Sequence, residues 1–358
     1  MRKYFSIFIF LGAVLLVGLL TEGEFFSARN LTNLTRQVCI NGILSLGMTY
    51  VIITAGIDLS VGSVVALSGI VAALLQTQGG ELFQGYFGAL LSFSSAVGVG
   101  FLCGLFNGAF IVQTKVVPFI ITLGLMVIAR GLALIFSNGA AVAPLAEEFN
   151  FFGQGYFDKT FSIALVCVAT FLGIFFNFRT HRNIFVLVAI LIVGGVFVYA
   201  FGGYRGAPVP VLIFGVLALL SHFFLKNTVW GRYVVATGSN AEAAFLSGVP
   251  VAGITLAVYT WMGALSGLSG AILSARLNGA LPTAGDLFEL DAIAAVVIGG
   301  TRLSGGVGSI GGSVLGAFLI GVLNNGMSLL NITEFYQKVI KGVIIILAVW
   351  LDTKGRKK

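Results

Sequence analysis

The chain has 358 residues, of which 58% are hydrophobic and 9% are charged, whereas a soluble domain carries about 25% charged residues. Such a chain cannot cover a water-facing surface, so its composition excludes a soluble globular protein and predicts a polytopic membrane protein. The formal net charge of +7 then indicates cytoplasmic loops that face anionic lipid, and no nucleic-acid partner. The three cysteines lie in apolar runs and the two histidines lie far apart, so we expect neither a disulfide framework nor a metal site.

Apolar segments that are candidates for membrane-spanning helices follow one another along the whole chain, because about 20 apolar residues cross a bilayer. They lie at 4–21, 39–57, 60–78, 86–114, 118–137, 160–177, 184–201, 208–225, 251–275, 289–300, 309–330 and 336–351. The segment at 289–300 is short and the chain breaks near 56–59, so we expect about 10 to 12 spans, including broken or re-entrant helices. The sequence therefore predicts an all-α polytopic membrane protein that forms a single transmembrane domain over residues 1–358.

The loops between these spans indicate an orientation. An even number of spans places both termini on one side, and most basic loop residues fall on the cytoplasmic side when both termini are assigned to it. The outer loops, which include 138–159, then collect acidic residues that favour contact with a basic patch on a partner; Asp291 and Lys341 are also assigned to outer loops. The mixed polar and apolar segment FFSARNLTNLTRQ at 25–37 predicts an interfacial amphipathic helix.

The stretch TAGIDLSVGS at 54–63 places Asp58 in an otherwise apolar part of the chain. Two interpretations remain open. Asp58 caps the next helix by accepting hydrogen bonds from the amides near Ser60 and Val61, or the break lies within the membrane and lines a path through it, where an acid is functional by default.

Other polar residues lie within apolar spans and have the same two interpretations. Asn107, Asn324 and Asn325 either form hydrogen bonds between helices or line a polar path. Arg130 also falls within a span, and we expect it near a membrane face, where its side chain reaches water.

Motifs exclude several functions. No G-x-x-x-x-G-K-[ST] motif occurs, so the chain does not bind ATP through a P-loop. GVGSIG at 306–311 matches a dinucleotide-binding pattern, but no strand precedes it, and we interpret this region as flexible backbone. Glycine pairs at 100–108, 263–267 and 312–316 favour close helix packing, with sliding helices as the alternative. No cluster of titratable residues predicts an enzyme.

The longest polar stretch on the predicted cytoplasmic side is KNTVWGRYVVATGSNAEAAFLSGVPV at 226–251. Ser239 or Asn240 is suited to cap a short helix with Glu242 in its first turn. Gly248 and Pro250 then end the helix. A short helix in this position fits a groove on a second protein.

Five stretches of the chain together resemble one protein family. They are TAGIDLSVGSVVALSG, KVVPFIITLGLMVIARGLALIFSNG, GRYVVATGSNAEAAFLSGV, ELDAIAAVVIGGTRLSGGVGSIGGSVLGAFLIGVLNNGMSLL and YQKVIKGVIIILAVWLD. In this order they resemble the permease subunits of bacterial carbohydrate importers of the ATP-binding-cassette (ABC) type, in the ribose, xylose and galactose class. The resemblance covers most of the chain and implies a permease fold related to the vitamin B12-type permeases, located in the bacterial cytoplasmic membrane.

The resemblance also implies partners. Two permease copies would pair with a cytoplasmic ABC ATPase, which binds ATP and Mg²⁺, and a periplasmic or surface-tethered sugar-binding protein would deliver the sugar. The permease itself would bind no cofactor and catalyse no reaction. A similar loop of the vitamin B12-type permeases sits in the ATPase groove, which implies a coupling loop at 226–250 in this chain. Its predicted coupling residues are Gly238, Ser239, Asn240, Glu242, Ala243, Ala244, Leu246, Ser247 and Gly248.

The substrate expectation comes from length. This chain has two apolar segments, at 184–201 and 208–225, where shorter ribose- and galactose-type members have one. The longer form resembles the xylose-type permeases and favours a pentose such as xylose or ribose. Candidates for the translocation path are Asp58, Asn107, Asn324 and Asn325. The alternatives are a carrier driven by protons or sodium, an ABC permease for another solute such as galactose or a nucleoside, and a membrane enzyme or scaffold.

Overall fold

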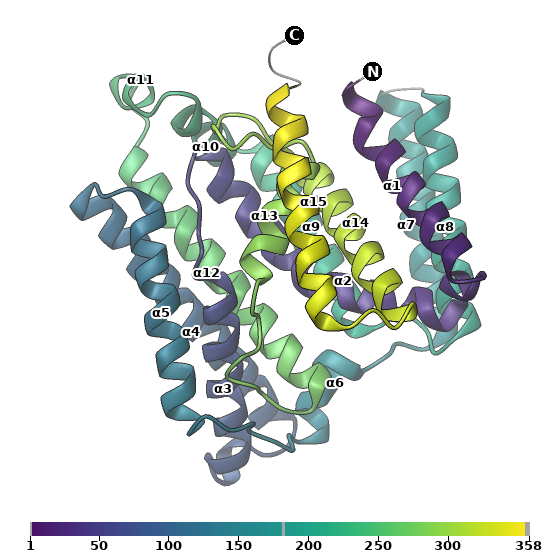
Figure 1. Cartoon of the computed structure of the whole chain (residues 1–358), viewed down its shortest axis with the longest axis horizontal. Helices are drawn as coiled ribbons and strands as arrows, with labels where there is room; N and C mark the ends of the chain where they lie inside the picture. Colours follow the sequence, from purple (N-terminus) through teal and green to yellow (C-terminus); the bar gives the residue numbers. More distant parts are fainter. Residues whose placement is uncertain (1, 181–182, 355–358) are drawn as a thin grey trace.

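A computed structural model describes residues 2–180 and 183–354, which fold almost entirely into helices (Figure 1). In chain order the elements are α1 (Arg2–Leu20), the 3₁₀ helix η1 (Glu24–Phe26), α2 (Ala28–Ile53), α3 (Val61–Gln78), the 3₁₀ helix η2 (Glu81–Phe83), α4 (Gly85–Thr114), α5 (Pro118–Phe136), α6 (Glu147–Gln154), α7 (Lys159–Thr180), α8 (Ile184–Gly203), α9 (Val209–Asn227), α10 (Val229–Ser239), α11 (Ala241–Leu246), α12 (Val251–Leu277), α13 (Phe288–Ile298), α14 (Ile310–Leu329) and α15 (Glu334–Lys354).

Nine helices within the described residues are long and apolar enough to cross a membrane. The predicted all-α polytopic membrane protein is therefore confirmed, and each predicted apolar segment coincides with a helix. Helix α13 has 11 residues and a length of about 16 Å. This is about half of the 30 Å hydrocarbon core, so the segment predicted at 289–300 does not cross the membrane by itself.

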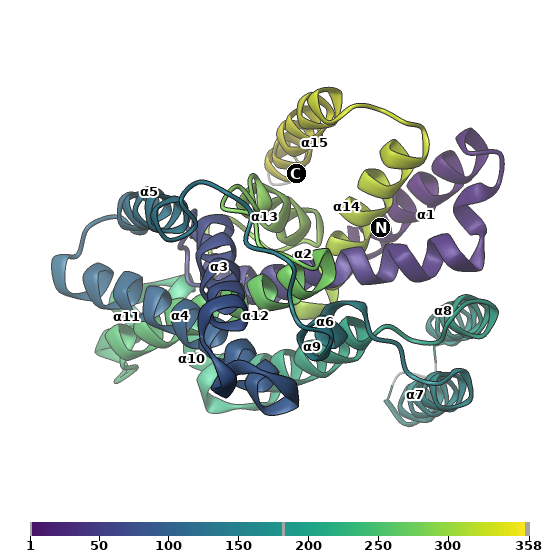
Figure 2. The same cartoon turned by 90° about the horizontal axis from the view of Figure 1, so that it is seen from below.

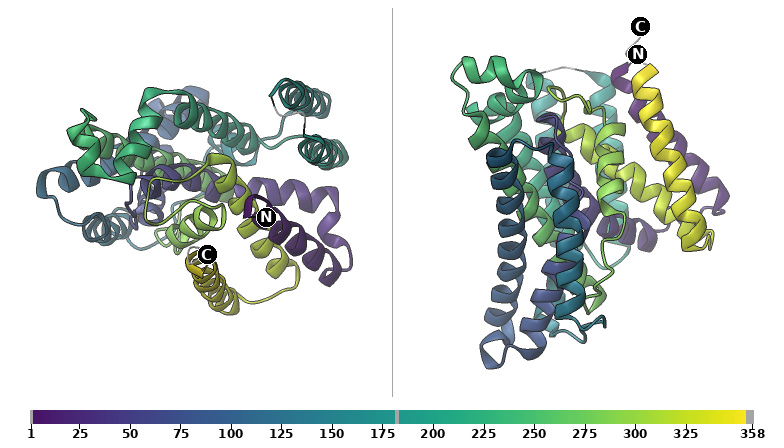
Figure 3. Two further views of the ribbon diagram at one scale, coloured as in Figure 1. Left: turned by 90° about the horizontal axis from the view of Figure 1, so that it is seen from above. Right: turned by 60° about the vertical axis from the view of Figure 1, so that its left-hand side comes forward.

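The first helix starts and the last helix ends on the same side as α11. The start of α1, the end of α15 and helices α10 and α11 are at the top of Figure 1, and we call this the α11 side. Helix α6 and the turn from α3 to α4 lie on the opposite side. Helices α7 and α8 form a hairpin at the edge of the bundle, and the left view of Figure 3 shows it standing apart from the central helices (Figures 2 and 3).

Helices α4 and α12 cross in close contact because glycines line both faces. Gly100 and Gly104 of α4 lie against Gly263 of α12, and the two backbones approach so closely that no side chain fits between them. Without a hydrophobic driving force between helices in lipid, association depends on such close backbone packing. The packing expected from the glycine pairs at 100–108 and 263–267 is thus present.

The interfacial helix predicted at 25–37 is wrong as a separate element. Ser27 caps α2 by accepting a hydrogen bond from the amide of Asn30 at 3.3 Å, and the helix then runs without interruption to Ile53. Two polar side chains of this segment find partners on other helices: Asn30 pairs with Asn325 in α14 at 2.9 Å, and Thr32 donates to the carbonyl oxygen of Ala200 in α8 at 3.0 Å. A mixed polar pattern does not show whether lipid headgroups or neighbouring helices receive the polar groups.

Two non-helical segments enter the bundle. Residues 54–60 connect α2 to α3, and residues 278–287, which are mostly turns, connect α12 to α13. Gly285 of the second segment packs on Gly62 in the first turn of α3, and the two backbones leave no room for a side chain on either residue. Non-helical backbone at membrane depth is tolerated where protein surrounds it, so this meeting point belongs to the interior of the fold.

Arg130 of α5 holds the second of these segments in place. Its guanidinium donates to the carbonyl oxygens of Pro282 at 2.6 Å and Ala284 at 2.8 Å. These carbonyl groups need a donor from elsewhere, because an irregular segment leaves them without helical partners. The predicted position of Arg130 near a membrane face stays a prediction, and its guanidinium is part-buried against this segment.

Candidate functional site

The polar stretch between α9 and α12 forms helices α10 and α11. Asn240 caps α11, because its side-chain oxygen accepts a hydrogen bond from the amide of Ala243 at 2.9 Å. This confirms the short capped helix predicted there. The helix ends before Gly248, whose φ of 83° favours glycine. Phe245 and Leu246 are 69% and 79% exposed, so α11 presents two large apolar side chains outward.

The remaining residues of the predicted coupling loop stabilise this helix locally. Ser239 and Ser247 each donate to the carbonyl oxygen four residues earlier, at 2.8 Å. Within α11, the side chain of Ala244 is buried, whereas Glu242 is exposed in the first turn. The loop therefore has one face packed on the bundle and one face free.

The end of α10 is tied to two other parts of the α11 side. Gly238 packs directly on the backbone of Ile53 at the end of α2 and of Gly306 in the α13–α14 connection. The amide of Gly306 also donates to the carbonyl oxygen of Ile53 at 2.9 Å. The end of α10 therefore lies in direct contact with the end of α2 and with the segment before α14.

Asp58 lies in a buried turn just before α3. Its Oδ1 accepts hydrogen bonds from the Ser60 amide at 2.9 Å and from the Ser60 hydroxyl at 2.6 Å. Helix α3 begins at Val61 with Ser60 in the capping position. Asp58 therefore accepts the bond from the Ser60 amide that the first interpretation expected, but Ser60, and not Asp58, occupies the N-cap position of α3.

Asn107 belongs to the same cluster. Its amide nitrogen donates to the Ser60 hydroxyl at 3.0 Å, so the structure brings Asp58 and Asn107 together through Ser60. The Asn107 side-chain oxygen and the Tyr259 hydroxyl are buried without a hydrogen-bond partner in the described part of the chain. Asn107 precedes the end of α4 by about 10 Å of helix, which places the cluster within the bundle on the α11 side.

Asn325 lies away from this cluster and pairs with Asn30 of α2. Each amide nitrogen donates to the other side-chain oxygen at 2.9 Å, and both residues are buried. This is the interhelical hydrogen bond that the sequence analysis left open as the alternative to a path-lining role.

Asn324 points in a different direction, into a cavity of about 160 Å³. Polar groups of Gln37, Asn41 and Arg276 also line this cavity, together with apolar residues of α2, α12 and α14. The side-chain oxygens of Asn41 and Asn324 are buried and have no hydrogen-bond partner among the described residues. A polar cavity of this kind within an apolar bundle suits a polar solute.

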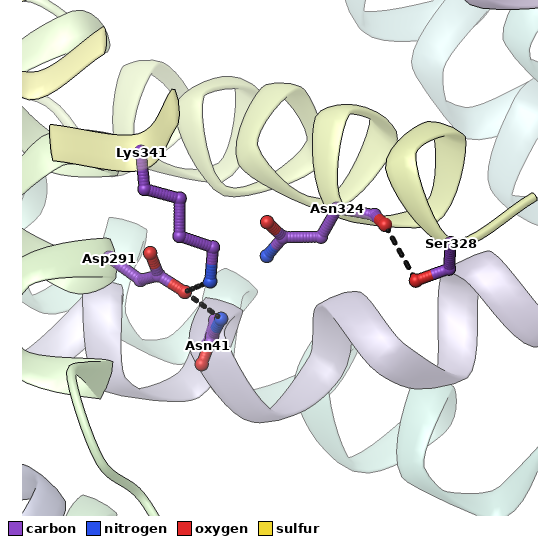
Figure 4. Close-up of polar contacts among 5 residues, drawn as sticks. All are labelled: Asn41, Asp291, Asn324, Ser328 and Lys341. Atoms are coloured by element: carbon purple, nitrogen blue, oxygen red, sulfur yellow. Dashed lines mark hydrogen bonds and ion pairs between the residues drawn. The ribbon is translucent and has the colours of Figure 1, made fainter. Parts of the chain in front are cut away.

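A buried ion pair lies beside Asn324. Lys341 of α15 contacts Asp291 of α13 at 2.9 Å, with side-chain exposures of 23% and 3%. The amide nitrogen of Asn41 donates to the same oxygen of Asp291 at 3.3 Å. Figure 4 shows Asn41, Lys341 and Asn324 converging on Asp291 from three helices. A second chamber of about 10 Å³ lies between Asp291, Asn324 and Lys341.

The sequence analysis missed this pair because it assigned Asp291 and Lys341 to outer loops. Both residues belong to helices, since α13 starts inside the bundle and Lys341 lies two turns into α15. One feature of the sequence could have predicted the pair. Lys338 and Lys341 are three residues apart and share one face of a helix, and each pairs with one of two nearby acids, Asp286 and Asp291.

The polar groups that line the two cavities are suited to hydrogen bonding. They are amides, one carboxylate and two cationic groups. Within the described ranges, no group of three or more His, Cys, Asp or Glu side chains is arranged to hold a metal ion.

Comparisons with known proteins give a consistent result. A family described as "Branched-chain amino acid transport system / permease component" matches residues 30–349. The xylose transport system permease protein XylH of Haemophilus influenzae is 39% identical over 94% of this chain and 92% of its own length. The XylH of Escherichia coli K12 is 38% identical over 99% of this chain and 93% of its own length. The ribose import permease protein RbsC of Bacillus subtilis is 38% identical over 96% of this chain and 92% of its own length. No solved structure matches the chain.

Proposed function

We propose that this chain, which belongs to the family of transport-system permease components that matches its residues 30–349, is the membrane-spanning subunit of an ABC importer for a pentose. Relatives named for xylose and for ribose support this substrate class. Their identities to this chain, 39% and 38%, are too similar to favour one sugar over the other.

The exposed helix α11 is the observation that carries the proposal. A soluble ATPase needs a rigid element to dock on, and α11 offers Phe245 and Leu246 at the surface of a capped helix. The direct contact of Gly238 with the ends of other elements provides a route by which motion of the ATPase reaches the bundle.

The partners and the orientation follow from the same proposal. The α11 side faces the cytoplasm, so both termini are cytoplasmic and the protein is a multi-pass protein of the bacterial inner membrane. A cytoplasmic ABC ATPase binds ATP and Mg²⁺ and docks on α11. A periplasmic or surface-tethered binding protein delivers the sugar on the opposite side, and a second permease copy completes the pore.

Transport proceeds by alternating access. Closure of the ATPases moves α11, and the helices that contact α10 shift with it as packed units. The cavity at Asn324 and the cluster of Asp58 and Asn107 are two polar stations on the proposed path. Asn325 is left out of the path, because Asn30 occupies its amide group.

The docking role of α11 is tested by replacing its apolar surface. Leu246→Asp should abolish co-purification of the ATPase, because a carboxylate in an apolar groove loses its hydration without gaining a partner. The matched control is Leu82→Asp, since Leu82 is also exposed, at 59%, but lies in η2 after α3. Equal ATPase recovery with both variants, each purified as a monodisperse permease, contradicts the docking role.

The energy source is tested by reconstitution. The proposal requires ATP, the ATPase and a sugar-loaded binding protein for uptake into liposomes. Uptake by this chain alone, driven by a proton or sodium gradient, would instead establish the ion-coupled carrier.

A further inference from the structure

Asn324 lines two chambers. The larger, of about 160 Å³, is lined by Gln37, Asn41, Arg276 and Asn324. The smaller, of about 10 Å³, is lined by the polar residues Asp291, Asn324 and Lys341 and by the apolar residues Ile320, Leu323, Met327 and Ile344. A water molecule needs about 10–15 Å³ of such space, so the smaller chamber has room for a single hydroxyl group.

The two chambers differ in how well their polar groups are satisfied. In the larger chamber, the buried side-chain oxygens of Asn41 and Asn324 have no hydrogen-bond partner among the described residues. In the smaller chamber, Asp291 and Lys341 satisfy each other at 2.9 Å. The larger chamber therefore presents open acceptors, and the smaller one presents a donor and an acceptor that already form a pair.

We infer that the larger chamber takes the ring of a neutral monosaccharide and that one sugar hydroxyl enters the smaller chamber, where it donates to Asp291 and accepts from Lys341. This inference rests on the proposed function and goes further by naming the residues that recognise the sugar. Asn41, which donates to Asp291 at 3.3 Å, holds the carboxylate in position for this contact.

The size and charge of the smaller chamber select a hydroxyl. A hydroxyl donates and accepts through one oxygen, which matches a carboxylate beside an ammonium group. A single charged group in this position is attracted by one member of the pair and repelled by the other, so it gains little electrostatic energy while it loses its hydration. A chamber of about 10 Å³ has room for one small group, so it does not admit both charged groups of an amino acid. The site therefore favours a neutral polyol over an amino acid.

The arrangement also suits a transport path. A path must bind its cargo weakly enough to release it. Because Asp291 and Lys341 already pair with each other, the sugar exchanges one set of hydrogen bonds for another and gains little net free energy. The pair thus provides selectivity without a deep binding well.

The experiment uses the complete complex in liposomes, with the ATPase inside and the binding protein loaded with xylose or ribose outside. Asp291→Asn and Lys341→Met should each slow the initial uptake of the sugar about tenfold, which corresponds to the loss of one charge-assisted hydrogen bond. ATP hydrolysis stimulated by the loaded binding protein should stay at the wild-type rate.

The matched controls are Asp286→Asn and Lys338→Met. This second ion pair joins α15 to the α12–α13 connection, one turn from the first pair on α15, at 3.0 Å, but it is 60% and 52% exposed. It lines neither chamber. Both control variants should import the sugar at the wild-type rate.

Sugar analogues separate recognition from folding. Wild-type complex should import one monodeoxy analogue of the pentose about tenfold more slowly than the parent sugar, and Asp291→Asn should import both sugars equally slowly. If a single variant fails to fold, the combined Asp291→Asn and Lys341→Met variant, which leaves no unpaired charge, replaces it with the same expectation.

The outcomes are distinct for the two proposals. If wild-type complex imports no pentose, the proposed function fails. If wild-type complex imports a pentose and the Asp291 and Lys341 variants do so at the same rate, the inference is overturned. It is also overturned if these variants slow the parent sugar and every deoxy analogue in equal proportion, because that result indicates a purely structural ion pair.

Discussion

Asn324 and Asn325 are neighbours in α14, yet their replacement is expected to have opposite effects. Consecutive residues of a helix point about 100° apart, and here one side chain faces the cavity while the other faces α2. Asn325→Ala should destabilise the permease without a specific transport defect. Asn324→Ala should slow sugar uptake and leave stability nearly unchanged.

The size of the stability effect follows from the hydrogen bonds. Asn30 and Asn325 exchange two bonds of 2.9 Å, and the Asn30 amide nitrogen also donates to the carbonyl oxygen of Phe25 at 2.9 Å. Asn325→Ala leaves the Asn30 oxygen without its donor, whereas the Asn30 nitrogen keeps a partner. A stranded buried acceptor costs about 1–3 kcal/mol. Interhelical pairs in membranes contribute about 0.6 kcal/mol on average, so we expect the lower end of that range.

A double-mutant cycle measures this effect. The variants Asn30→Leu, Asn325→Leu and the combination of both are unfolded in detergent, and the free energies of unfolding are compared. The combined variant should recover part of the loss, because neither polar group is then stranded. Strictly additive losses, or an equal loss of stability in Asn324→Ala, would refute the assignment of the two asparagines.

Three further predictions concern the fold. Gly263→Leu should prevent recovery of a monodisperse permease, because the new side chain meets the backbone of α4. The control Gly98→Leu should behave as wild type, because nothing lies within 4 Å of its Cβ position. A monodisperse Gly263→Leu protein contradicts the packing argument. Asp58→Asn keeps the acceptor oxygen, so its free energy of unfolding should lie within about 1 kcal/mol of the wild-type value, whereas Asp58→Ala should lose about 1–3 kcal/mol. An equal loss in both variants would show that the charge itself stabilises the turn. Arg130→Met removes two hydrogen bonds to the α12–α13 connection and should speed proteolysis of residues 278–287; an unchanged cleavage rate would mean that other contacts hold the segment.

The helices and their order were predictable from the sequence because lipid imposes a simple requirement. Each spanning helix needs a long apolar run, and every such run was visible in the hydropathy. The short helix α11 was predictable for a different reason. Asn240 provides a cap, and Gly248 takes a positive φ at the other end, so local backbone chemistry fixes both ends.

The faces of the helices were not predictable, because a spanning helix is apolar on all sides and its periodicity does not show which side faces protein. For this reason the sequence alone did not separate Asn324 from Asn325, and both were predicted to form interhelical hydrogen bonds or to line a polar path. The pairing of Asp291 with Lys341 depends on a contact between α13 and α15 that no local pattern specifies. Helix α6, within the loop at 138–159, was also not foreseen.

The apolar segments at 184–201 and 208–225, from which the sequence analysis predicted a pentose, do not form the proposed sugar site. The extra apolar segment that resembles the xylose-type permeases belongs to the region of α8 and α9. Helices α7 and α8 have only 11% and 17% of their apolar windows buried, against 83% for α2, and no residue of α7 or α8 within the described chain lines either chamber. The length of this region therefore marks relatedness. Helix α8 contacts α2, where Thr32 donates to Ala200, and α9 packs against α2 and α14, which line the proposed sugar chambers. Differences in sugar selectivity among these permeases should instead arise at the positions of Asn41, Asp291 and Lys341.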